Sequence, residues 1–205
     1  MSKTNLIQPY HILLADDGSS HAQAAIDLIK ILPLQKGSKI HVVTVFSPRQ
    51  ISEHERLRDH VLNSRESLLR SDLDVTANLV LGYPAEKINE LSAETNPNLV
   101  VIGAKGLRAT MGILLGGVAQ QVVEYAKSPV LVVRATFVKL NKILIVIDGS
   151  ICSEYATSFL TSIPLAAATE ITVMHFLQHI PVVTPIAKTW PIGPELLGMT
   201  TPDWS

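Results

Sequence analysis

Residues 99–118 have the sequence LVVIGAKGLRATMGILLGGV, in which an apolar run leads directly into a glycine-rich stretch. The four apolar residues from Leu99 to Ile102 are typical of a strand that is buried on both faces. The glycines between 103 and 117 allow tight turns and a close approach of the backbone to a ligand. A helix is predicted next, over residues 118–127. This stretch therefore predicts a buried strand, a glycine loop and a helix in succession.

The chain on either side continues this alternation. Further strands are predicted at 12–15, 40–46, 75–81 and 129–134. Helices are predicted between them from apolar residues at helical spacing, namely Ala22, Ala25, Ile26 and Ile29, then Leu57, Val61, Leu62, Leu68 and Leu69, then Ala85, Ile88 and Leu91. Apolar strands that alternate with helices predict an α/β fold, an open parallel five-stranded sheet with helices on both faces.

Composition excludes several classes of function. The 205 residues carry 17 Lys and Arg against 18 Asp and Glu, so no basic surface indicates a nucleic acid or an anionic membrane as partner. The single cysteine, Cys152, excludes an intrachain disulfide framework and a cysteine-based metal cluster. The first eleven residues contain no apolar signal core, and no segment suits a membrane span. We therefore expect a cytoplasmic protein.

The chain also repeats its own beginning. When Asp148 is placed over Asp17, a shift of 131 positions, ten of 36 aligned residues are identical, whereas roughly two would match by chance. The matches include the triplet 17–19 (DGS) over 148–150 (DGS). We interpret residues 1–136 as a complete domain, 137–177 as an incomplete second copy and 178–205 as a proline-rich tail.

The second copy amounts to one β-α-β unit. A unit of about 40 residues buries too little apolar surface to fold alone. We expect it to dock on the first domain near the strand at 129–134. Exchange with another chain and poor order are the alternatives.

Two features indicate a ligand at the carboxyl edge of the predicted sheet. Backbone amides of a glycine loop and of a helix N-terminus attract anions, so the loop can cradle phosphate, although its spacing matches neither the Walker motif nor the dinucleotide fingerprint. Asp17 follows the first strand, where a carboxylate can accept hydrogen bonds from ribose hydroxyls or a base amine. Each feature alone is explained as well by turn formation or helix capping. Together they favour a ligand site, because both lie at strand carboxyl ends.

Four segments resemble the universal stress protein family: 15–19 (ADDGS), 99–106 (LVVIGAKG), 115–119 (LGGVA) and 128–134 (SPVLVVR). The resemblance covers residues 10–134 as a complete domain and about 138–177 as the start of a second. It implies a Rossmann-like three-layer sandwich of the adenine nucleotide alpha hydrolase-like type. Tandem members pair two such domains, so it also implies a homodimer or an intrachain pseudo-dimer.

In the ATP-binding members that this chain resembles, the loop has the pattern Gly-x2-Gly-x9-Gly-Ser/Thr. The resemblance implies that adenosine contacts Ala15, Asp17 and Val45, and that the phosphate side is lined by Ile102, Gly103, Gly106, Gly116, Gly117 and Val118. Gly117 stands where the family has a hydroxyl. Because one hydrogen bond contributes about 0.5–1.5 kcal/mol, we expect weakened binding rather than none. Lys105 and Arg108 are candidate cations beside the phosphates.

The resemblance implies a non-catalytic stress-response or signalling module that binds ATP, with Mg2+ as the accompanying ion and no catalytic residue of its own. A slow ATPase or phosphoryl-transfer enzyme at the same pocket is the first alternative, and a nucleotide-free interaction module is the second. The second copy repeats Asp148 but has no glycine loop, so we expect it to form only half a site.

Other polar residues receive simpler interpretations. His175 and His179 would chelate a metal on a helix, but a strand separates them by about 13 Å, so no metal site is predicted. His54 and His60 lie in a charged helix and are expected to be exposed. Asp16 should face the opposite side of its strand from Asp17, so the two are not expected to form an acid–base pair.

Overall fold

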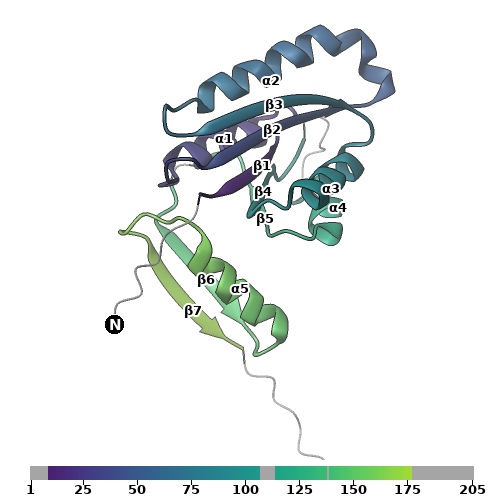
Figure 1. The fold of residues 1–205 in the computed structure, drawn as a ribbon. Helices are drawn as coiled ribbons and strands as arrows, with labels where there is room; N and C mark the ends of the chain where they lie inside the picture. The colour runs from purple at the N-terminus through teal and green to yellow at the C-terminus, as the bar shows by residue number, and fades with distance from the viewer. Residues whose placement is uncertain (1–8, 107–113, 138, 177–205) are drawn as a thin grey trace, which may run out of the picture.

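The computed structural model describes residues 9–106, 114–137 and 139–176. Five parallel strands form one sheet in the order β3-β2-β1-β4-β5 (Figure 1). Their bounds are β1 His11–Ala15, β2 Lys39–Phe46, β3 Asp74–Leu81, β4 Leu99–Gly103 and β5 Val130–Val133. The α/β fold with an open five-stranded parallel sheet is confirmed. The strand order reverses between β1 and β4, which is the point where open α/β sheets bind ligands.

Four helices cover this sheet: α1 Ser20–Ile31, α2 His54–Leu68, α3 Pro84–Thr95 and α4 Gly117–Tyr125. A short 3-10 helix, η1 Pro48–Glu53, directly precedes α2. The Ser19 side chain caps α1 by accepting from the Ala22 amide, and Pro84 begins α3, where a missing N–H costs nothing. None of the described helices combines the length and apolar character needed to cross a membrane.

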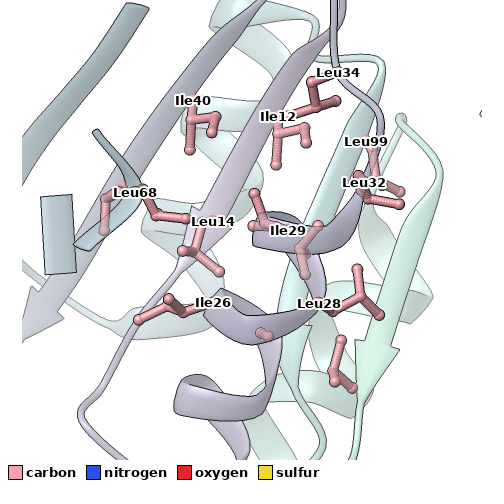
Figure 2. Close-up of a cluster of buried hydrophobic side chains, with 14 of the residues drawn as sticks. Ile12, Leu14, Ile26, Leu28, Ile29, Leu32, Leu34, Ile40, Leu68 and Leu99 are labelled. Carbon is pink, nitrogen blue, oxygen red and sulfur yellow. The ribbon is translucent and has the colours of Figure 1, made fainter. Parts of the chain in front are cut away.

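Alternate residues of β1 divide the core into two layers. Ile12 and Leu14 pack on one face against apolar side chains of α1 such as Ile29 (Figure 2). Leu13 and Ala15 pack on the other face in a second cluster, with side chains of α3 and α4. The four β1 side chains are almost completely buried. The burial of both faces of β1 explains why residues 12–15 are continuously apolar.

Beyond the first domain, residues 142–175 form a second β-α-β unit with β6 Lys142–Ile147, α5 Ile151–Ser162 and β7 Glu170–His175. Its turn repeats the first one: Gly149 has φ 78° and Gly18 has φ 77°, and Ser150 caps α5 as Ser19 caps α1. Among the described strands, β6 and β7 pair only with each other and add nothing to the main sheet (Figure 1). The interpretation of this unit as an incomplete second domain stays a prediction.

The second unit contacts the first domain through α5. Phe159 and Ile163 pack against the cluster on the α1 face, which also contains Val133 of β5. Tyr10 belongs to the same cluster, and burial raises the pKa of its phenol to about 12, with the Ser162 hydroxyl partly offsetting the rise. These contacts place α5 on the first domain while none of its residues is fully buried.

Replacing Phe159 with Ala removes one of these apolar contacts. We expect the second unit to be digested at least about threefold faster by proteinase K, because local opening exposes the backbone, while the 10–134 core stays intact. Limited proteolysis followed by mass spectrometry measures this. Tyr155→Ala on the same helix, where the side chain is 71% exposed, should digest like the wild type. Equal rates for Phe159→Ala and the wild type would show that the contact does not hold the unit in place.

Candidate functional site

A cavity of about 330 Å³ lies at the carboxyl ends of β1, β2 and β4. It is bounded by the first residues of α3 and α4 and by the start of the glycine-rich loop. Its lining residues are Ala15, Asp16, Asp17, Val43, Val45, Pro84, Ile88, Ile102, Gly103, Lys105, Gly106, Gly116, Gly117, Val118 and Ala119. The size lies at the lower end of the range usual for small-molecule sites.

The structure brings all nine of the predicted site residues to this one cavity. Ala15, Asp17 and Val45 come from the ends of β1 and β2, and the other six from β4, the loop and α4. Lys105 lies among them, whereas Arg108 falls outside the described residues. Sequence reasoning did not name Asp16, Val43, Pro84, Ile88 and Ala119 as lining residues. The helix residues Pro84 and Ile88 carry no motif, and only the packing of α3 brings them to the cavity.

Two glycines permit a close approach of chain segments beneath the cavity. A Cβ at Gly103 would lie 2.8 Å from the Ala22 amide nitrogen and 2.9 Å from the His21 carbonyl carbon. A Cβ at Gly106 would lie 2.6 Å from Asp17 Oδ2. The first glycine therefore lets β4 pass close to the start of α1, and the second lets the loop pass over the Asp17 carboxylate.

The other two glycines form the N-terminus of α4. Gly116 is the N-cap residue, and its N–H donates to the Ala104 carbonyl at 2.8 Å. Gly117 is the first helical residue, and a Cβ built on it meets nothing within 4 Å. The first amides of a helix have no intrahelical acceptor, and the helix dipole makes this end positive. With Lys105 on the same cavity, this end suits an anionic group.

Ser19 joins the turn after β1 to the glycine loop. Its N–H donates to Asp17 Oδ1 at 3.0 Å, and its hydroxyl donates to the Lys105 carbonyl at 3.1 Å. The same hydroxyl accepts from the Ala22 amide as the cap of α1. Ser19 therefore connects the turn at Asp17, the start of α1 and the glycine loop through its hydrogen bonds.

Asp16 points away from Asp17, as the strand alternation predicts, and is 3% exposed beneath α2. Its carboxylate accepts from Ser64 Oγ at 2.6 Å and from the Gly18 amide at 2.9 Å, and lies 2.9 Å from His60 Nε2. Burial alone would raise the pKa of Asp16, but the His60, Ser64 and Gly18 partners outweigh it and hold that pKa below its ordinary value.

The expectation that His60 is exposed was wrong. Its side chain is only one-third exposed, because the ring turns inward to the Asp16 carboxylate. The spacing of four between His60 and Ser64 places both on one face of α2, and this was the available signal. His54 is exposed as expected, with its ring 5.6 Å from that of Phe46.

Within the described ranges, no three His, Cys, Asp or Glu side chains gather where they could hold a metal ion. His175 ends β7, and His179 lies outside the described residues.

The sequence model of the universal stress protein family matches residues 10–134. The chain belongs to this family. A relative from Thermus aquaticus, named "Universal stress protein in QAH/OAS sulfhydrylase 3'region", is 32% identical over 138 residues, which are 60% of this chain and 97% of the relative. The resemblance of the first domain to universal stress proteins is confirmed.

Solved structures support the same fold for this universal stress protein. The hypothetical protein MJ0577 has a TM-score of 0.56 at 24% identity, over 60% of this chain and 94% of its own. The universal stress protein UspA from Lactobacillus plantarum has a TM-score of 0.53 at 20% identity, over 62% of this chain and 99% of its own. Other universal stress proteins have been solved in complex with cAMP, with dAMP and with AMP.

The close approach at Gly103 can be tested by substitution. Gly103→Ala forces a methyl group against backbone atoms of α1, so we expect a loss of about 1–3 kcal/mol in the free energy of unfolding. Gly117→Ala places the same methyl group in open space and should stay within about 1 kcal/mol of the wild type. Urea denaturation measures both. A Gly103→Ala protein as stable as the wild type would contradict the tight packing of β4 on α1.

Proposed function

We propose that the cavity binds an adenine nucleotide, ATP with Mg2+, and that the protein acts in the cytoplasm as a non-catalytic stress-response or signalling module. One observation carries the proposal. The nine residues predicted to hold a nucleotide come from four separate segments of the chain, and all nine line one cavity.

The end of the cavity formed by β1 and β2 suits the nucleoside. Ala15, Val45, Ile88 and Ile102 supply apolar side chains that can pack on the faces of a base. The Asp17 carboxylate can accept hydrogen bonds from ribose hydroxyls or from the exocyclic amine of adenine. Asp17 is also held by the Ser19 amide, so its orientation is set before a ligand arrives.

The end formed by α4 suits the phosphates. The helix N-terminus at Gly117 and the Lys105 side chain both favour negative charge, whereas Asp17 would repel it. This division of charge orients the nucleotide with its phosphates toward α4. Mg2+ keeps several water ligands and is usually bound by phosphate oxygens, so it would travel with ATP rather than occupy a site of its own.

A bound nucleotide would join the ends of β1, β2 and α4, and this is how binding can alter partner binding or assembly. A ligand changes such an equilibrium only through its different affinity for the two states. We propose a homodimer or an intrachain pseudo-dimer with the second unit as the assembly that responds. Slow ATP hydrolysis and a nucleotide-free interaction module are the alternatives, which a product assay and a binding assay separate.

Asp17→Ala removes the carboxylate at the nucleoside end. We expect the wild type to bind ATP with Mg2+ saturably, and Asp17→Ala to bind at least about tenfold more weakly, because a hydrogen bond to a charged group is lost. Isothermal titration calorimetry measures both, beside Asp27→Ala on the exposed face of α1 as a control. The absence of binding by the wild type up to millimolar ATP would favour the interaction module.

Gly117→Ser restores the hydroxyl that ATP-binding members carry at this position. Because a Cβ at Gly117 meets nothing within 4 Å, we expect the serine to fit without strain and to tighten ATP binding about two- to tenfold. Gly117→Ala fills the same space without a hydroxyl and should bind like the wild type. Equal affinity of the serine and alanine variants would mean that the phosphates do not reach the start of α4.

A further inference from the structure

Asp16 and Asp17 are adjacent carboxylates that serve opposite faces of the sheet. Asp17 faces the cavity side, near Gly106, whereas Asp16 is buried beneath α2. An uncompensated carboxylate in such a position is costly, and α2 supplies the compensation through His60 and Ser64. The charge of Asp16 is therefore balanced by side chains of α2.

His60 also packs on the turn that follows Asp17. A Cβ at Gly18 would lie 3.4 Å from His60 Cε1 and Nε2, so the ring covers this turn at van der Waals distance. Gly18 has φ 77°, a conformation that favours glycine, and its amide donates to Asp16 Oδ1. One imidazole therefore lies against the Asp16 carboxylate and over the Gly18 backbone, about one methyl group away from it.

We propose that His60 is a positioning residue for the nucleotide site, and that its protonated form holds the turn at residues 16–18 in the conformation that binds ligand. This inference rests on the proposed nucleotide function and adds a control by pH to it. His60 is not among the residues that line the cavity, and its contact with Asp16 connects it to them.

The charged groups around His60 determine the direction of the effect. Asp16 lies in contact, Asp17 acts at longer range, and Arg56 approaches from the preceding turn of α2. The Asp16 partner raises the pKa of His60 above its ordinary value, against the opposing effects of burial and of Arg56. Asp16 has a lowered pKa and stays ionised through the neutral range.

Because the pKa of His60 is raised in the folded protein, the His60–Asp16 ion pair stabilises the fold fully below the pKa of histidine in the unfolded chain, about 6.5. That stabilisation is lost as the pH rises through the pKa of His60 in the folded protein. The lowered pKa of Asp16 means that its own contribution is lost only when the pH falls below its unfolded value of about 3.8. At alkaline pH a neutral His60 leaves the buried Asp16 carboxylate without its cationic partner, so the turn that carries Asp17 loses part of its support. Affinity for an anionic nucleotide should therefore fall as the pH rises.

The test measures the dissociation constant of ATP with Mg2+ from pH 6 to pH 9. We expect the affinity of the wild type for ATP to weaken over this range about three- to tenfold more than that of His60→Gln. The glutamine variant is the reference because it carries no titrating group at position 60. His54→Gln, an exposed histidine on the same helix, should follow the wild type. His60→Lys keeps a positive charge at this position and should hold its affinity up to pH 9. The titration of ATP itself is common to all four proteins and cancels in the comparison.

The outcomes separate the two proposals. A wild type that does not bind ATP at any pH contradicts the nucleotide function itself. A wild type that binds ATP with the same pH profile as His60→Gln overturns the role of His60 alone. Circular dichroism and thermal unfolding show whether each variant is folded. If His60→Gln does not fold, the affinities of His60→Lys and the wild type for ATP are compared at pH 9 instead. Equal affinities of these two proteins would overturn the proposal.

Discussion

The central strand β1 imposes the constraint on which the rest of the molecule depends. It pairs with β2 on one side and with β4 on the other, and helices cover both of its faces. A buried strand in this position can carry no unpaired polar group, so it is apolar over residues 12–15. The first carboxylates appear where the sheet pairing ends, because only there can water, a partner or a ligand satisfy them.

The candidate site follows from this constraint. The chain leaves β1 toward α1 and leaves β4 toward α4, in opposite directions along the sheet, so a hollow remains between the two exits. Glycine at position 103 lets β4 approach the start of α1, and glycine at position 106 lets the loop lie against Asp17. At Gly117, by contrast, an added Cβ meets nothing within 4 Å, so there is free space at the N-terminus of α4.

The neighbouring carboxylates of Asp16 and Asp17 have different roles at this edge of the sheet. The Asp17 carboxylate lies on the cavity side beside Gly106, whereas the Asp16 carboxylate is paired with His60 and Ser64 of α2. Because a buried carboxylate must be paired, the packing of α2 and the shape of the turn are linked through His60 and Ser64. The glycine pattern between residues 103 and 117 gives no sign of this link, because α2 packs on the opposite face of the sheet from the cavity.

The sequence by itself determined the strand and helix alternation, the parallel sheet and the residues of the glycine loop, because these depend on local periodicity and on a spacing within one segment. It also indicated that Asp16 and Asp17 face opposite sides, since side chains alternate along a strand. Only the tertiary structure decided that Pro84 and Ile88 of α3 border the cavity and that His60 turns inward to Asp16. The first outcome has no local signature, and the spacing of His60 and Ser64 indicates only that the two share one face of α2. Each depends on how one helix is rotated and seated against a strand that is distant in the sequence, and the packing of the whole core sets that rotation.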